Sequence, residues 1–232
     1  MTKATRYVDG DGVWVEILGT PKAAPALFLD RDGVVVVETH YLHEVEKTEL
    51  IPGAGETIAL ANQRGIHVVL VTNQSGVGRG LYGWAEFQAV QDRIMADLAA
   101  FGARVDAVCA CPYHPEAAAP YDREHPDRKP NPGMLLKAAR ALQIDLAPSW
   151  IVGDLPSDMG AGRNAGRRPR PDRLVRNPGR SPEPRRRRFP GHRRQKHRRG
   201  PRPDPTAVGV RIWLQSGGRS SGTIRPNLLW PL

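Results

Sequence analysis

Four short clusters of polar residues follow one another along the first 166 residues. They are Asp30-Arg31-Asp32-Gly33, Thr72-Asn73-Gln74-Ser75, Arg128-Lys129 and Gly153-Asp154. Asp30 and Asp32 are two residues apart, so in extended backbone their side chains lie on the same side. Together with Asp154 they would repel one another unless a hard cation bound them, and Mg²⁺ prefers oxygen ligands.

These residue types suit the transfer of a phosphoryl group. A carboxylate can attack phosphorus and form an aspartyl-phosphate. A neighbouring carboxyl group can protonate the leaving oxygen and later activate water. Thr72 and Asn73 offer hydrogen-bond donors to phosphoryl oxygens, and Lys129 supplies positive charge where negative charge builds up.

Each cluster by itself also has a simpler interpretation. An Asp-x-Asp pair is often a turn or a surface pair, Thr72-Asn73 could cap a helix, and a lone Lys129 is usually a solvated charge. The clusters are convincing because they occur in order, each beside the element expected to position it.

Those elements are strands alternating with amphipathic helices. Apolar and β-branched runs predict strands, which cover residues 26–29, 66–71, 105–109 and 150–152. Apolar spacings of three and four, with Pro or Gly near the ends, predict helices, which cover residues 53–63, 85–101, 132–142 and 157–165.

This alternation predicts an α/β fold with a doubly wound, Rossmann-like parallel sheet covered by helices on both faces. In such sheets ligands bind at the carboxyl ends of the strands. Three of the four strands end in a polar cluster, and Arg128-Lys129 precedes the third helix. We therefore expect the four clusters to meet at one edge of the sheet.

The longer phrases around the clusters resemble a known family. They are Phe28-Leu29-Asp30-Arg31-Asp32-Gly33, Val71-Thr72-Asn73-Gln74-Ser75-Gly76, Arg128-Lys129-Pro130-Asn131-Pro132-Gly133-Met134 and Ile151-Val152-Gly153-Asp154. They resemble the motifs of the haloacid dehalogenase superfamily, in particular the D-glycero-D-manno-heptose 1,7-bisphosphate 7-phosphatase and histidinol-phosphatase family. The resemblance covers about residues 25–166.

The resemblance implies roles for individual residues. Asp30 would be the nucleophile and Asp32 the general acid and base. Mg²⁺ would be held by Asp30, Asp154 and the backbone carbonyl of Asp32. Substrate contacts would come from Glu38, Thr39, His40, Tyr41, Thr72, Asn73, Gln74, Ser75, Arg128 and Lys129.

The implied activity is hydrolysis of a small sugar phosphate, first of all the heptose 7-phosphate of lipopolysaccharide heptose biosynthesis. Histidinol phosphate or another small phosphomonoester is the alternative substrate.

Two departures from the family pattern concern metal and substrate binding. Cys111 matches the first cysteine of the family's zinc loop, but Tyr113, His125 and Asp127 stand where other zinc ligands belong. A zinc-free loop is the expectation, although a site built from zinc-type ligands stays open, and these ligands would be Cys109, Cys111, His114 and His125. The family usually has Lys after the metal-binding Asp of its fourth motif, and here it is Leu155.

The third departure is the carboxyl-terminal region. Residues 1–166 hold 15 Lys and Arg against 21 Asp and Glu, whereas residues 167–232 hold 19 against 3. Residues 167–206 contain 15 Arg and 9 Pro, a composition that does not bury enough surface to fold. We interpret the chain as an extension (1–24), a phosphatase domain (25–166) cut short at its carboxyl-terminal end, and a disordered or frameshifted tail (167–232).

Two further hypotheses concern partners and compartment. The Arg-rich tail could instead bind nucleic acid, because Arg neutralises phosphates. The two cysteines form no disulfide framework, and we see neither a secretory signal nor an apolar run long enough for a membrane span. We expect a cytoplasmic monomer with no membrane partner.

Overall fold

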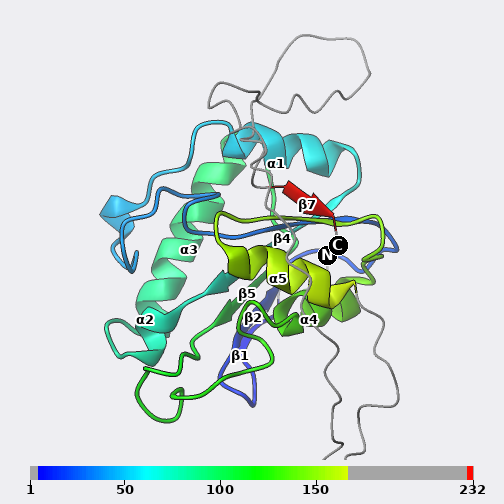
Figure 1. Ribbon diagram of the computed structural model, residues 1–232. Helices are drawn as coiled ribbons and strands as arrows, with labels where there is room; N and C mark the ends of the chain where they lie inside the picture. The colour runs from blue at the N-terminus through cyan, green and yellow to red at the C-terminus, as the bar shows by residue number, and fades with distance from the viewer. Residues whose placement is uncertain (1–4, 167–228, 232) are drawn as a thin grey trace, which may run out of the picture. The chain divides into compact units, whose positions relative to one another are not determined.

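The computed structural model describes residues 5–166 and 229–231, whose helices and strands alternate along the chain (Figure 1). The strands are β1 (Thr5–Val8), β2 (Trp14–Ile17), β3 (Ala26–Leu29), β4 (His67–Asn73), β5 (Ala107–Cys111), β6 (Trp150–Val152) and β7 (Leu229–Pro231). The helices are α1 (Ala54–Gln63), α2 (Ser75–Gly78), α3 (Trp84–Ala99), α4 (Gly133–Leu142) and α5 (Pro156–Ala165), with a 3₁₀ turn, η1 (Val45–Lys47).

The described strands form one sheet in the order β1-β2-β5-β4-β3-β6-β7. The four central strands, β5, β4, β3 and β6, all run parallel to one another. The pairs at both edges, β1–β2, β2–β5 and β6–β7, are antiparallel. The predicted α/β fold is therefore confirmed, with antiparallel strands added at each side of its parallel centre.

The antiparallel strands on the β5 side come from the N-terminal segment. The sequence predicts residues 1–24 to be an extension ahead of the domain. In the structure β1 and β2 form a hairpin, and β2 pairs along β5 from Trp14 opposite Ala110 to Ile17 opposite Ala107. This part of the segment thus extends the central sheet.

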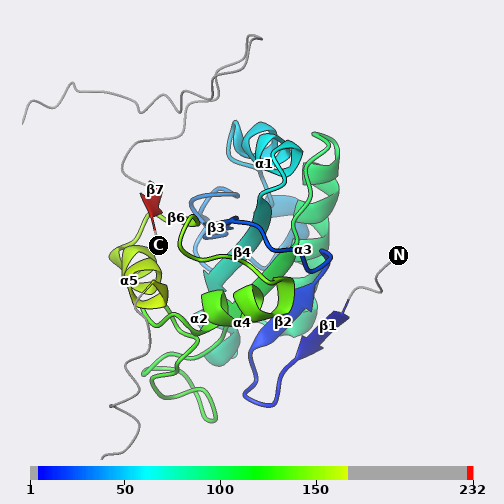
Figure 2. The same cartoon turned by 90° about the vertical axis from the view of Figure 1, so that its right-hand side faces the viewer.

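Side-chain alternation along the strands produces two apolar layers. Val68 and Leu70 of β4 face the layer that includes residues of α1 and α3. Val69 and Val71 face the layer that includes residues of α4 and α5. Successive side chains of a strand point to opposite faces, so a continuous apolar strand is covered by helices on both sides (Figure 2).

Strand β5 begins at Ala107, two residues later than predicted, because Asp106 pairs with its neighbour through its side chain. The backbone N–H of Asp106 donates to the carbonyl of Val68 at 2.7 Å, and its Oδ2 accepts from the N–H of Val68 at 2.8 Å. Regular pairing starts after this contact and continues until Asn73 lies opposite Cys111. Thr72 and Asn73, predicted to follow strand β4, are therefore its last residues.

The predictions for the tail fall almost entirely on residues 167–228, which lie outside the described residues. Of the predicted tail, residues 167–232, the structure describes only β7, which pairs antiparallel with β6. Within residues 5–166 and 229–231, none of the helices has the length and apolar character needed to cross a membrane.

Candidate active site

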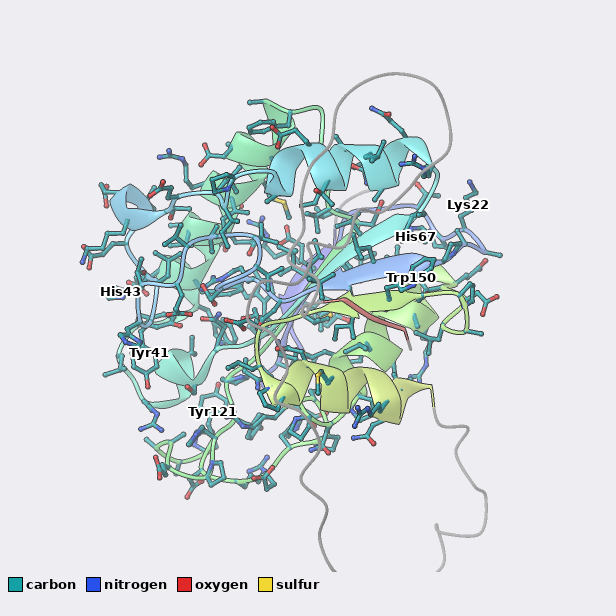
Figure 3. All side chains as sticks on the ribbon, turned by 45° about the horizontal axis from the view of Figure 1, so that its top comes forward. Lys22, Tyr41, His43, His67, Tyr121 and Trp150 are labelled. Carbon is teal, nitrogen blue, oxygen red and sulfur yellow. The ribbon has the colours of Figure 1, made fainter. Side chains whose placement is uncertain are left out.

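The carboxyl ends of the central strands lie together at one edge of the sheet. In Figure 3, Lys22, His67 and Trp150, which precede or begin strands, lie at one end of the sheet. Tyr41, His43 and Tyr121, which belong to loops after strands, lie at the opposite end. The polar clusters follow the strands on that second side, as the rule for parallel sheets predicts.

Asp30 and Lys129 form a buried ion pair at this edge. Asp30 follows β3, is 6% exposed, and its backbone N–H donates to the carbonyl of Val152 at 2.9 Å. The ammonium group of Lys129 lies 2.9 Å from Oδ1 of Asp30 and 2.5 Å from Oδ1 of Asp158, and it donates to the carbonyl of Val71 at 2.9 Å. The ammonium group thus makes one hydrogen bond and two ion pairs inside the protein.

Asp154 completes a group of three carboxylates around this ion pair. One oxygen each of Asp30, Asp154 and Asp158 lies within 4.8 Å of the other two. A Cβ on Gly33 would lie 2.5 Å from Oδ2 of Asp154, so this glycine leaves the space that the Asp154 carboxylate occupies. We call Asp30, Lys129, Asp154 and Asp158 the Asp30 cluster.

The electrostatics of the Asp30 cluster leave negative charge in excess. Burial raises the pKa of Asp30 to about 6, against the lowering effect of Lys129. Burial likewise raises the pKa of Asp154. Burial alone would lower the pKa of Lys129, but Asp30 and Asp158 outweigh it and the pKa rises. Three carboxylates beside one ammonium group fit a hard divalent cation such as Mg²⁺ in charge and in ligand type.

The side chain of Asp32 belongs to a separate set of contacts. Arg31, fully buried, donates to it from Nε at 3.1 Å and Nη2 at 3.0 Å. Gln74 Nε2 donates to Asp32 Oδ2 at 2.8 Å, and the Thr72 hydroxyl lies 3.4 Å from the same oxygen. The hydroxyl of Tyr82 donates to Oε1 of Gln74. We call Arg31, Asp32, Thr72, Gln74 and Tyr82 the Asp32 network.

Asn73 connects the second polar cluster to the third. Its Oδ1 accepts from the backbone N–H of Lys129 at 3.0 Å, and its Nδ2 donates to the carbonyl of Lys129 at 3.1 Å. The amide therefore fixes the backbone that delivers the Lys129 ammonium group. Ser75 begins helix α2 and is partly exposed.

The remaining predicted substrate residues lie on two loops. Glu38, Thr39, His40 and Tyr41 are exposed in the loop after β3. Glu38 Oε1 accepts from the backbone N–H of His40 at 2.6 Å, and His40 and Tyr41 both have positive φ angles. Arg128 is partly buried and donates from Nη1 to the carbonyl of Tyr113 at 2.7 Å.

The loop that resembles a zinc loop is held by aromatic contacts in the described structure. The rings of Tyr113 and His125 stack with centroids 4.0 Å apart, and the guanidinium of Arg123 lies 4.8 Å from the Tyr113 centroid. Among the described residues, the Asp30 cluster supplies the only group of three or more His, Cys, Asp or Glu side chains close enough to share an ion. Cys109, Cys111, His114 and His125 form no such group there.

Three residues of the site had no assigned role in the sequence prediction. Asp158, four positions after Asp154, is a buried partner of Lys129. Arg31 lay unassigned between two aspartates, and Tyr82 lay outside every cluster. Of the three, only Asp158 has a local feature that could have drawn attention to it, because it is an acidic residue in the first turn of a predicted helix.

Comparison with known proteins agrees with this geometry. A family model described as haloacid dehalogenase-like hydrolase matches residues 2–166. The chain is 48% identical over 159 residues to the D-glycero-beta-D-manno-heptose-1,7-bisphosphate 7-phosphatase of Mesorhizobium japonicum, a match covering 67% of this chain and 73% of that protein.

Two solved structures have a similar fold. A candidate HAD-like phosphatase from Mesorhizobium loti matches with a TM-score of 0.67 and 46% identity, covering 70% of this chain and 79% of that one. The D,D-heptose 1,7-bisphosphate phosphatase from B. bronchiseptica, complexed with magnesium and phosphate, matches with a TM-score of 0.56 and 37% identity, covering 61% and 76%. The chain therefore belongs to the haloacid dehalogenase-like hydrolases, as its four motifs predicted.

Proposed function

We propose that this protein is a phosphatase that removes the 7-phosphate of D-glycero-D-manno-heptose 1,7-bisphosphate in the cytoplasm. The observation that carries the proposal is the Asp30 cluster, in which a buried carboxylate at a strand end faces an ammonium group and two further carboxylates. The relative with 48% identity and the B. bronchiseptica structure carry the names of such phosphatases. Histidinol phosphate and other small phosphomonoesters are the alternative substrates.

The first half of the proposed reaction transfers the phosphoryl group to Asp30. A carboxylate oxygen of Asp30 attacks phosphorus, and the bond from phosphorus to the ester oxygen breaks. The Asp32 carboxyl gives its proton to that leaving oxygen and becomes a carboxylate. Lys129, fixed by Asn73 and by the Val71 carbonyl, supplies positive charge beside the reacting carboxylate.

The second half releases phosphate. Water attacks the aspartyl-phosphate and gives a proton to Asp32, so free Asp30 and the protonated Asp32 are restored. Mg²⁺ held by Asp30 and Asp154, with the Asp32 carbonyl as a further ligand, would neutralise charge on the phosphoryl group. Asp158 stays on Lys129 in this proposal and balances its charge.

The proposal is tested by phosphate release from a panel of substrates with Mg²⁺ and with EDTA. The panel contains the heptose 1,7-bisphosphate, histidinol phosphate and simple sugar monophosphates. We expect the highest kcat/KM for the bisphosphate and loss of activity in EDTA. Folded protein that released phosphate from none of these substrates would contradict the proposal.

The hypothesis of nucleic-acid binding through the Arg-rich tail concerns residues outside the described structure, and no contact described above bears on it.

A further inference from the structure

Every polar atom of the Gln74 side chain is engaged inside the protein. The residue is 3% exposed. Its Nε2 donates to Oδ2 of Asp32 and to the hydroxyl oxygen of Thr72, both at 2.8 Å. The hydroxyl of Thr72 has one hydrogen, which it directs to Oδ2 of Asp32, so its oxygen accepts from the amino end of the amide and Oε1 of Gln74 faces Tyr82. The amide has no free donor for a bound substrate in this arrangement.

Tyr82 holds this amide from the opposite side. It belongs to the segment that connects α2 to α3, is 8% exposed, and its hydroxyl donates to Oε1 of Gln74. A Cβ on Gly76 would lie 2.2 Å from Cε1 of Tyr82. Gly76 is thus needed for the close approach of this ring. The ring of His43 stacks on Tyr82 with centroids 5.3 Å apart and planes 7° from parallel.

These contacts form a continuous chain from an aromatic pair to Asp32. His43 and Tyr82 fix each other by stacking, Tyr82 fixes the orientation of the Gln74 amide, and the amide holds one carboxylate oxygen of Asp32. Arg31 holds mainly the other oxygen, Oδ1. The carboxylate is therefore restrained on both oxygens.

We propose that Gln74 and Tyr82 are positioning residues that aim the Asp32 carboxyl at the leaving-group oxygen, rather than substrate ligands. The inference rests on the proposed phosphatase function. When the bond between phosphorus and the ester oxygen breaks, its electron pair stays on that oxygen and the proton of Asp32 moves to it. A carboxyl turned away from the oxygen makes this transfer slow, although Asp30 can still attack.

The dependence of the rate on the leaving group separates this role from a general structural one. An alkyl phosphate needs a proton on its leaving oxygen, whereas p-nitrophenyl phosphate releases a stable phenolate without one. The value of kcat/KM reports the steps through formation of the aspartyl-phosphate, so hydrolysis of that intermediate does not affect it. The measurement is kcat/KM of the full chain on the heptose bisphosphate and on p-nitrophenyl phosphate.

We expect Tyr82→Phe to lower kcat/KM on the sugar phosphate about 5- to 10-fold, the effect of losing one hydrogen bond. Gln74→Met should lower it about 100-fold, at the low end of the contribution of general acid catalysis. On p-nitrophenyl phosphate both variants should stay within about 3-fold of wild type, because no proton is needed there. KM for the sugar phosphate should change little, since neither side chain binds it.

Tyr113→Phe is the matched control. It also removes a buried phenol hydroxyl that donates a hydrogen bond, here to the carbonyl of Asp11 at 2.6 Å. The ratio of the two kcat/KM values should equal that of wild type in this variant. Circular dichroism and urea unfolding of all three variants establish that each is folded under assay conditions.

Equal losses on the two substrates, or a loss expressed only in KM, would overturn the positioning role while leaving the phosphatase function in place. Full activity of Gln74→Met on the sugar phosphate would overturn it too. If wild-type protein releases phosphate from neither substrate, the proposed function itself fails and this inference fails with it.

Discussion

The Asp30 cluster and the Asp32 network meet at the same edge of the sheet but differ in charge balance. The Asp30 cluster sets three carboxylates against the single ammonium group of Lys129. The Asp32 network sets one carboxylate against the guanidinium of Arg31, with neutral donors on the remaining positions. The first therefore has negative charge left for a cation, whereas in the second Arg31 matches the charge that Asp32 carries once it has given up its proton. In the proposed reaction, the Asp30 cluster would hold the metal, whereas the Asp32 network holds the carboxyl group that transfers the proton.

The largest effect should come from removing the nucleophile. Asp30→Asn leaves a side chain of similar size that cannot form the aspartyl-phosphate, so we expect phosphate release to fall by at least about 10³-fold. Asp32→Asn should also be inactive on sugar phosphates, yet it should still trap phosphate on Asp30 when given p-nitrophenyl phosphate. Intact-mass spectrometry after rapid quenching checks both. A labelled Asp30→Asn protein would contradict the assignment of the nucleophile.

The second prediction tests the buried cation. Lys129→Met leaves the carboxylates of Asp30 and Asp158 buried without their partner, and breaking a buried ion pair in this way costs about 3 to 5 kcal/mol. The free energy of urea unfolding, measured in EDTA at pH 7.5, gives the value. Lys47→Met is the control, because its ion pair with Glu44 is exposed, and it should change the free energy of unfolding far less than Lys129→Met does. Similar costs for the two variants would show that burial does not govern the Lys129 pair.

The third prediction concerns pH and the excess charge of the Asp30 cluster. Burial raises the pKa of Asp30 to about 6, above its ordinary value, so the folded protein binds this proton more tightly than the unfolded chain. Stability of the metal-free protein therefore falls as pH rises from about 4 to about 6 because of this group. Asp30→Asn removes the penalty and should stabilise the metal-free protein by about 2 to 3 kcal/mol at pH 7.5.

Unfolding of wild type and Asp30→Asn in EDTA at a series of pH values checks this. The difference between them should be small at pH 4, grow to about pH 6 to 7, and then stay constant. A difference that is already complete at pH 4 would contradict the raised pKa.

The fourth prediction uses Mg²⁺ to compare the two regions directly. At a concentration ten times its dissociation constant the ion should stabilise wild type by about 1.4 kcal/mol. Asp154→Asn should lose this gain, because it removes a carboxylate of the Asp30 cluster, whereas Tyr82→Phe in the Asp32 network should keep it. Thermal unfolding with Mg²⁺ and with EDTA is the measurement, and equal gains in all three proteins would argue against a metal site at Asp154.

The smallest effect should come from adding a positive charge beside the Asp30 cluster. Leu155 follows Asp154 and is 56% exposed, so a lysine there meets no steric obstacle. Leu155→Lys should stabilise the metal-free protein by less than about 1 kcal/mol and lower KM for the sugar phosphate a few-fold. Leu155→Met, of similar length without charge, is the control, and an equal fall of KM in both variants would exclude a charge effect.

Much of the fold and part of the site follow from local sequence patterns. The strand ending at Leu29 and the run of β-branched residues in β4 mark the parallel centre, and the order of the polar clusters places Asp30, Lys129 and Asp154 at one edge. The pairing of β2 along β5 could not be derived, because the hairpin residues carry no signal for their partners 90 to 96 residues away in the chain.

In the site, too, some features follow from local sequence and others depend on the packing of distant segments. The amino-acid sequence by itself determined which side chains can carry out phosphoryl transfer, since residue type and position after a strand are local properties. Tertiary structure alone decided which carboxylates share Lys129, that Arg31 is buried against Asp32, and that Tyr82 reaches Gln74. Burial and hydrogen-bond partners depend on how distant segments pack, and the pKa of Asp30 depends on that burial.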